Sequence, residues 1–250
     1  MKVEPDRWYY WTDKLGILVW QDMPAAIEMG YSKHPEYLPD IEGQYEHELR
    51  RMIQGRNNHP SIVVWIPFNE GWGMTYAKEK SPDGMSLPAP ESKNREQRMV
   101  TAIRDEDPTR LIDAESGAGG GGKDRKEDLW NFGFGDILDY HAYGGQIPVP
   151  EKNRAIVVGE YGWGPDPSTR VPQFLKSLEG KGISGMVLTQ LTDVENEANG
   201  PIKYDRAVKG PLTLEKTGET IVRAFHDDGY ADYPGGSDQA AAAKEDDQKP

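Results

Sequence analysis

The sequence predicts an α/β fold, an incomplete (β/α)8 barrel of the TIM type. Short apolar runs alternate with amphipathic stretches of helical periodicity, which is typical of a parallel sheet with helical crossovers. Polar and aromatic residues follow several of the apolar runs, as they do at the active face of such a barrel. Neither a G-x-G-x-x-G motif after an early strand nor a P-loop is present, which disfavours a doubly wound nucleotide-binding sheet.

Six apolar runs are the expected strands, and their continuous apolar character is typical of parallel strands buried on both faces. They cover residues 17–20, 62–67, 111–114, 137–141, 155–158 and 185–188. Helices are expected at residues 7–15, 41–57, 91–104, 172–178 and 214–225. A complete barrel has eight strands, and this chain opens on a helical stretch. We therefore expect about the first two βα units to be missing.

A single barrel domain is expected at residues 1–230, followed by a disordered acidic tail at residues 231–250 that is rich in Gly, Ala, Asp and Lys. Residues 116–128 contain four consecutive glycines and predict a flexible loop on the active face or a disordered insert. A barrel without its first strands would expose two parallel edges. The chain is therefore expected to be a fragment of a longer protein, or else to form an oligomer through these edges.

The composition disfavours several classes of protein and of partner. The net charge of −13 opposes binding to nucleic acid or to an anionic membrane, and no apolar stretch is long enough to span a bilayer. The lack of cysteine excludes disulfides, thiolate nucleophiles and cysteine-based zinc sites. The N-terminus has no apolar signal core, so we expect a cytoplasmic location for the chain as written, with a periplasmic or secreted parent enzyme as the alternative.

Two glutamates occur in similar sequence contexts. In residues 58–73 (NHPSIVVWIPFNEGWG), an apolar strand is followed by Asn69 and Glu70, with Trp72 beside them. Residues 155–164 (AIVVGEYGWG) repeat this arrangement around Glu160 and Trp163. Apolar surroundings raise the pKa of a carboxyl group, which a general acid needs if it is to hold its proton near neutral pH. These segments therefore predict a pair of catalytic carboxylates.

These motifs, in this order, resemble the barrel domain of glycoside hydrolase family 2, which includes β-galactosidases, β-glucuronidases and β-mannosidases. The segment DKLGILVWQDMP at residues 13–24 is similar to the third-strand region of that family, and TDVENEANGPIKYDR at residues 192–206 is similar to the segment after the last strand. The resemblance covers roughly residues 2–225. It implies a retaining, β-galactosidase-like O-glycosyl hydrolase with a carbohydrate substrate, and we expect no cofactor and no metal. The family's preceding β-sandwich domains and first two barrel strands have no counterpart here.

The resemblance also implies roles for individual residues. Glu70, at the end of the fourth strand of the family barrel, would be the acid/base, and Glu160, at the end of the seventh, the nucleophile. Asn69 would bind the sugar 2-hydroxyl, and either His141 or Tyr143 would hold the nucleophile carboxylate. Three further residues are expected at the sugar site: Trp72, Trp163 and Asp22.

Each of these residues also has a simpler interpretation. A glutamate at a strand end is usually solvated or salt-bridged, Asn69 could form a turn, and His141 could be a structural hydrogen-bonding residue. The remaining tryptophans of interest, Trp8, Trp20 and Trp65, are expected in the core. His59 is expected to fix a loop.

Two further alternatives concern metal binding and function. The acidic group Asp193, Glu195 and Glu197 lacks the glycine and ligand order of a calcium loop, which favours a solvated loop over a cation site. The alternative function is a truncated, non-catalytic carbohydrate-binding or scaffold barrel.

Overall fold

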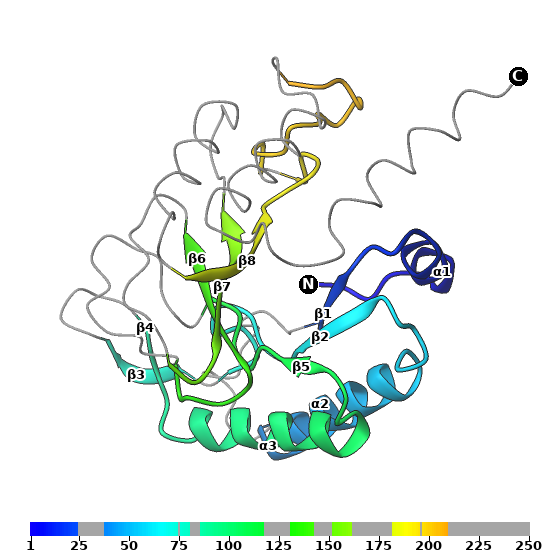
Figure 1. Ribbon diagram of the computed structural model, residues 1–250. Helices are drawn as coiled ribbons and strands as arrows, with labels where there is room; N and C mark the ends of the chain where they lie inside the picture. The colour runs from blue at the N-terminus through cyan, green and yellow to red at the C-terminus, as the bar shows by residue number, and fades with distance from the viewer. Residues whose placement is uncertain are drawn as a thin grey trace, which may run out of the picture. The chain divides into compact units, whose positions relative to one another are not determined.

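The computed structural model describes residues 1–24, 38–74, 76–80, 86–117, 131–142, 152–161, 182–195 and 197–209 (Figure 1). The chain divides into two compact units. The larger comprises Met1–Trp163 and Gly182–Thr189, and the smaller comprises Gly164–Lys181 and Gln190–Pro250. All of the helices and strands among the described residues lie in the larger unit. The predicted helices at residues 172–178 and 214–225 and the predicted tail at residues 231–250 lie outside the described residues.

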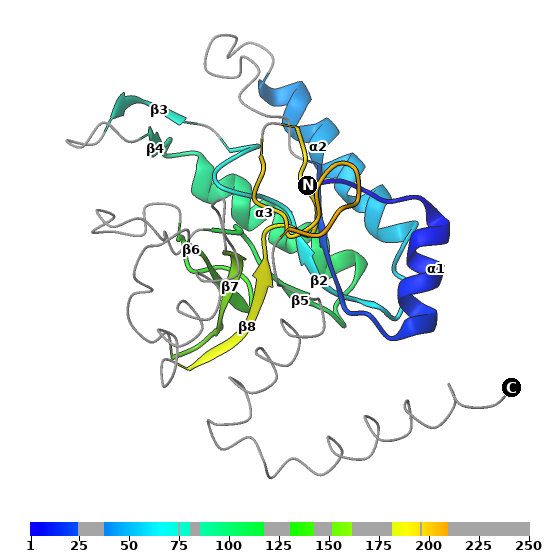
Figure 2. The same cartoon turned by 90° about the horizontal axis from the view of Figure 1, so that it is seen from above.

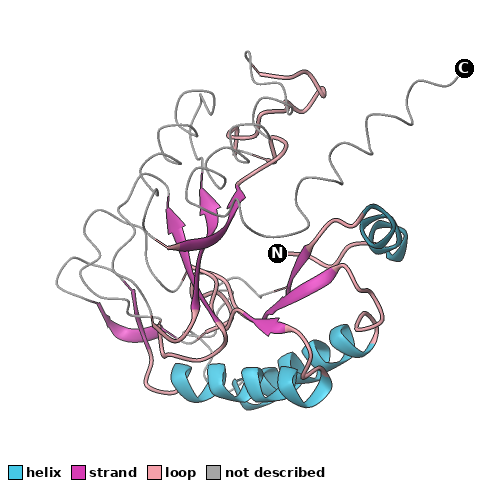
Figure 3. Cartoon of the chain, in the orientation of Figure 1, coloured by secondary structure: helices cyan, strands magenta, loops and turns pink. Residues whose placement is uncertain are grey.

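Six parallel strands form the centre of the larger unit, in two sheets of three (Figure 3). Their bounds are β1 (Val19–Asp22), β2 (Ile62–Ile66), β5 (Leu111–Ile112), β6 (Ile137–Ala142), β7 (Ala155–Tyr161) and β8 (Ile183–Leu188). The strand orders are β1-β2-β5 and β6-β7-β8, with every neighbouring pair parallel. A parallel bridge between Asp113 and Ile137 links the two sheets. The six strands thus follow one another in chain order, and each lies within a few residues of its predicted position.

Three helices are described: α1 (Asp6–Leu15), α2 (Leu38–Gln54) and α3 (Ser92–Glu106). Helix α1 ends at Gly16, whose φ of 69° lies in the left-handed region that favours glycine at this position. Helices α2 and α3 lie side by side in both views (Figures 1 and 2), and ion pairs join them. None of the described helices is long and apolar enough to cross a bilayer. The antiparallel hairpin of β3 (Tyr76–Lys80) and β4 (Ser86–Pro88) was not predicted.

The strand β2 is buried on both faces, as its continuous apolar sequence predicts. Ile62 and Trp65 belong to a large cluster that includes residues of α2 and α3. Val64 and Ile66 pack with Val157 of β7 in a second cluster. Because β2 is packed on both sides, its C-terminal end is held rigidly, and so is the start of the segment that follows it.

The side chain of Trp65 links the core to the polar residue that follows helix α3. It is fully buried, and its Nε1–H donates a hydrogen bond of 2.9 Å to Asp107. Burial acts to raise the pKa of Asp107, but hydrogen bonds from Thr109, Trp65 and Arg110 outweigh it and lower the pKa to about 2. The tryptophan therefore contributes both packing and a charge-assisted hydrogen bond.

Replacing Trp65 with alanine is expected to lower the free energy of unfolding by about 3–5 kcal/mol, because it leaves a cavity in the core. Urea denaturation followed by circular dichroism measures this change. The control is Leu111→Ala on the neighbouring strand β5, where the leucine is 48% exposed and the expected change is about 0.5 kcal/mol. Equal losses in the two variants would contradict the assignment of Trp65 to the core.

Candidate active site

Glu70 lies in a tight turn directly after β2. Isolated backbone β-bridges join Asn69 to Ser116 and to Trp72. The Glu70 N–H donates a hydrogen bond of 2.9 Å to the Ser116 carbonyl. The φ angles are 53° at Glu70 and 78° at Gly71, both in the left-handed region. A residue other than glycine persists there only where its surroundings fix it, and such strain clusters at functional sites. The turn leaves the Glu70 side chain 40% exposed.

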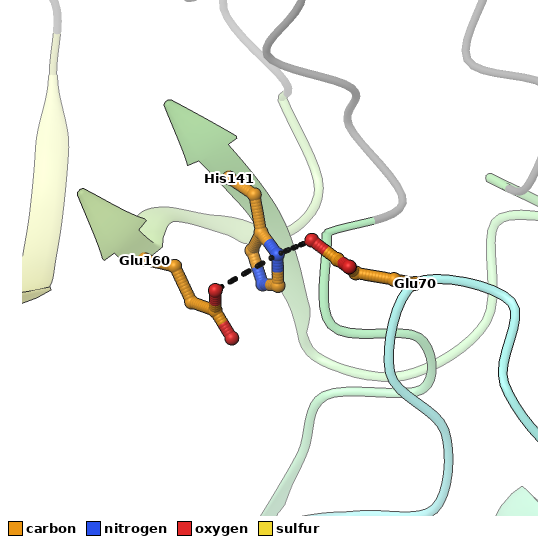
Figure 4. Close-up of side chains that lie close together, drawn as sticks. All are labelled: Glu70, His141 and Glu160. Carbon is orange, nitrogen blue, oxygen red and sulfur yellow. Dashed lines mark hydrogen bonds and ion pairs between the residues drawn. The ribbon is translucent and has the colours of Figure 1, made fainter. Parts of the chain in front are cut away.

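A histidine near the end of β6 lies between Glu160, near the end of β7, and Glu70, in the loop after β2 (Figure 4). His141 of β6 is 6% exposed, and its Nδ1 lies 2.7 Å from Oε1 of Glu70 and 3.6 Å from Oε2 of Glu160. Glu160 of β7 is paired with His141 in the strand register. One side-chain atom from each of the three residues lies within 4.8 Å of the others. The parallel strands thus bring Glu70 and Glu160 together, although they are distant in sequence.

Polar groups also hold the far side of the His141 ring. The Nε2 atom lies 3.0 Å from Oγ of Ser116 and 3.7 Å from Oδ2 of Asp139. Gly117 packs directly on the ring, since a Cβ added there would lie 2.9 Å from Nδ1 of His141. With its φ of 82°, this position requires glycine for its backbone and for the space that the ring occupies.

The electrostatics of the site favour a charged imidazole. Burial alone would lower the pKa of His141, but the neighbouring carboxylates of Asp139, Glu70 and Glu160 together raise it to about 10. His141 is therefore an imidazolium at neutral pH. Its positive charge offsets the repulsion between two carboxylates held close together.

Asp22, at the end of β1, interacts electrostatically with Glu160, Asp139 and His141. Burial, with the charges of Glu160 and Asp139 acting in the same direction, raises the pKa of its carboxyl to about 6 against the opposing effects of the N-terminal amino group and His141. A group with a pKa of about 6 can change its protonation state near neutral pH.

Two more carboxyl groups lie buried behind the Glu70 turn. Oε1 of Glu115 accepts a hydrogen bond of 2.5 Å from the Gly71 N–H, directly after Glu70. Burial raises the pKa of Glu115 well above its ordinary value, and the nearby charges of Glu96 and Glu70 act in the same direction. Burial also raises the pKa of Glu96 to about 8. Glu115 therefore holds the turn through its hydrogen bond to the backbone of Gly71.

A known protein family matches the N-terminal half of this chain. The profile described as "Glycosyl hydrolases family 2, TIM barrel domain" matches residues 4–136, which is more than half of the chain. The chain belongs to glycosyl hydrolase family 2. The TIM-barrel fold class predicted from the sequence is thereby confirmed.

Curated relatives in this family are larger proteins. Beta-mannosidase B of Emericella nidulans is 36% identical over 87 residues, which are 32% of this chain and 10% of that protein. Beta-mannosidase of Mus musculus is 36% identical over 67 residues, which are 27% of this chain and 7% of that protein. The aligned part of the chain thus spans a tenth or less of the length of these two relatives.

Solved family 2 structures share the fold. A Bacteroides uniformis β-glucuronidase superposes with a TM-score of 0.62 and 20% identity, over 84% of this chain and 29% of that one. A β-galacturonidase from Eisenbergiella tayi, bound to galacturonate, superposes with a TM-score of 0.62 and 18% identity, over 86% and 42% of the two chains. Both superpositions cover more of the chain than the 4–136 match, so the likeness to the TIM-barrel fold extends beyond residue 136.

Most of the predicted site residues of this family 2 chain lie near one another. Glu70, Asn69 and Trp72 share one turn, and His141 joins Glu70 to Glu160. The shortest contact of His141 is to Glu70, the expected acid/base, rather than to Glu160. Tyr143 and Trp163 lie outside the described residues. His59 fixes a loop as expected, with Nδ1 at 2.7 Å from Asp13 and its ring stacked on Tyr9.

The sequence analysis missed the buried carboxyl groups around the site. Their signal was nonetheless present, because an acidic residue within an otherwise apolar strand must find a buried partner or stay protonated. Such residues occur in LIDAES at residues 111–116 and in ILDYH at residues 137–141. They are Asp113, Glu115 and Asp139, all of which are at most 3% exposed.

The described residues contain one group with the composition of a metal site, namely Glu70, His141 and Glu160. A metal ion held by this group would bind the deprotonated imidazole in place of its proton. In the smaller unit, Asp193 accepts a hydrogen bond of 3.1 Å from the Gly200 N–H and forms an ion pair with Lys209, so its carboxylate has partners within its own loop.

The raised pKa of His141 predicts a stability that depends on pH. Because this pKa is about 10 in the folded chain and ordinarily 6.5, protonation favours the folded state. The contribution is complete below pH 6.5 and is lost as the pH rises through about 10. Urea denaturation across this window is expected to show the loss in the wild type and a flatter profile in His141→Gln. Parallel profiles for the two proteins would contradict the assignment.

Proposed function

We propose that this chain is the catalytic barrel of a retaining β-glycosidase that cleaves β-linked O-glycosides, with Glu160 as the nucleophile and Glu70 as the acid/base. The observation that carries the proposal is the approach of the two glutamates, whose side-chain oxygens lie within 4.8 Å of each other. Retaining enzymes hold their two carboxyl groups about 5–5.5 Å apart, whereas inverting enzymes leave about 6.5–9.5 Å for a water molecule. The short separation supports double displacement.

In the first step, Glu160 attacks the anomeric carbon while Glu70 gives its proton to the leaving oxygen. The glycosidic bond breaks, and a covalent glycosyl ester forms on Glu160. In the second step, the Glu70 carboxylate removes a proton from water, which attacks the same carbon and releases Glu160. The His141 imidazolium donates a hydrogen bond to Glu70 and stabilises the negative charge that moves between the two glutamates.

Sugar binding is assigned to the residues around this pair. We propose that Asn69 binds the 2-hydroxyl, that Asp22 binds another hydroxyl, and that Trp72 lines the site together with Tyr143 and Trp163. The curated relatives named above are β-mannosidases, while the superposed structures are a β-glucuronidase and a β-galacturonidase. We therefore propose a β-mannoside as the first substrate to test, with a β-glucuronide and a β-galactoside as the comparison substrates.

Proton NMR of the sugar released from aryl β-glycosides tests both the activity and its stereochemistry. The expected first product is the β-anomer, which then mutarotates. The α-anomer as the first product would overturn the retaining mechanism. An absence of hydrolysis across the three sugars, together with retained binding of one of them, would overturn the enzymatic proposal.

The second candidate is a non-catalytic carbohydrate-binding or scaffold barrel. It is favoured by the six parallel strands among the described residues, two fewer than the eight of a complete TIM barrel. The same NMR experiment separates the two candidates, because this one predicts sugar binding without turnover.

A further inference from the structure

Asp139 occupies a central place beneath the two glutamates, although it touches neither of them. It lies on β6, two residues before His141, and is 1% exposed. Its Oδ2 accepts a hydrogen bond of 2.7 Å from Oγ of Ser116, and the same hydroxyl lies 3.0 Å from Nε2 of His141. Asp139 is thus linked to Glu70 through Ser116 and the His141 ring.

The other oxygen of Asp139 leads to Glu160. Oδ1 accepts a hydrogen bond of 2.5 Å from the Gly159 N–H, which belongs to the residue immediately before Glu160. Gly159 fits this place because a Cβ there would lie 2.6 Å from Cγ of Asp139, far inside van der Waals contact. The backbone that carries Glu160 is therefore fixed directly to the Asp139 carboxylate.

We propose that Asp139 is a positioning residue that holds the two working glutamates in register, through Gly159 on one side and through Ser116 and His141 on the other. This inference rests on the proposed function, because it concerns the same pair of carboxylates. A shift of about 1 Å in a reacting group can cost about a hundredfold in rate. A single buried carboxylate that joins both halves of the site would prevent such a shift.

The neighbouring Asp113 provides a matched control. It is as deeply buried as Asp139, at 1% exposure. Within the described part of the chain, neither side-chain oxygen of Asp113 has a hydrogen-bond partner, whereas each oxygen of Asp139 accepts a hydrogen bond. Asp113→Asn thus changes a buried carboxyl group to an amide of nearly the same shape without breaking a hydrogen bond. Asp139→Asn leaves one acceptor oxygen for two donors.

Inactivation by 2-deoxy-2-fluoro-β-glycosyl fluorides isolates the nucleophilic step, because fluoride leaves with little help from an acid. Intact-protein mass spectrometry follows the labelling, and peptide mapping locates it on Glu160. Asp139→Asn is expected to slow labelling about 10- to 100-fold, with inhibitor binding unchanged. Asp113→Asn is expected to label at close to the wild-type rate. Gly159→Ala, which presses on Asp139 from the other side, is expected to slow labelling as well.

The outcomes separate this inference from the proposed function. Labelling of Asp139→Asn at the wild-type rate would overturn the positioning role. Equal slowing of labelling in Asp139→Asn and Asp113→Asn would overturn it as well. If the wild type is not labelled at all, the proposed function fails. In that case the nitrogen-15 NMR chemical shift of His141 Nε2 still tests the positioning role of Asp139. A changed shift in folded Asp139→Asn supports the positioning role, and an unchanged shift overturns it.

Discussion

Replacing Glu160 with glutamine is expected to lower kcat/KM for aryl β-glycosides by a factor of about 10⁴ or more, the scale of loss seen when an enzyme nucleophile is removed. The amide has nearly the same shape as the carboxylate but cannot form the glycosyl ester. Its effect is therefore on chemistry rather than on folding. Initial rates of nitrophenol release measure the loss.

The control for this prediction is Glu48→Gln on α2, where the exposed carboxylate accepts a hydrogen bond of 2.6 Å from Gln44. That variant is expected to turn over substrate at the wild-type rate. If Glu160→Gln kept a tenth or more of the wild-type kcat/KM, the nucleophile would have to be another residue. The short approach between Glu70 and Glu160 would then need another explanation.

Replacing Glu70 with alanine is expected to give a loss that depends on the leaving group. For alcohols and sugars, which need a proton as they leave, kcat/KM is expected to fall by about 10³-fold, within the usual range for general acid catalysis. For dinitrophenolate, which leaves unprotonated, kcat/KM is expected to stay near the wild-type value. In that case kcat is expected to fall, because the second step has lost its base.

Adding azide to the Glu70→Ala variant tests whether Glu70 is the base of the second step. A small anion can enter the space left by the carboxylate and attack the glycosyl-enzyme without a base. The expected product is the β-glycosyl azide, accompanied by recovery of kcat. An equal loss with all leaving groups, or an α-azide, would contradict the role proposed for Glu70.

The sequence was sufficient to predict the strands and the two glutamates for a simple physical reason. Strands buried on both faces are continuous apolar runs, and a parallel barrel brings their C-terminal ends to one side. The position of Glu70 after β2 and that of Glu160 at the end of β7 follow from this rule. The β3–β4 hairpin was missed, although Pro82, Asp83 and Gly84 between its strands are typical turn residues.

The contacts between side chains could not be predicted in the same way. His141 was expected to face the nucleophile, yet its nearest carboxylate is that of Glu70. Its ring orientation depends on Ser116 and on Gly117, which come from a different part of the chain. Trp8 was expected in the core but is 39% exposed, while the adjacent Tyr9 is fully buried. Neither detail is fixed by local sequence, because each depends on which neighbours the fold supplies.

The glycines packed against the site restrict how this protein can evolve. At Gly117 and Gly159 any larger side chain would collide with His141 or Asp139, so nearly every substitution there is expected to be selected against. Under the proposed function, a change of sugar preference is therefore expected to arise at other positions, where a change in side-chain size leaves the geometry of the two glutamates intact.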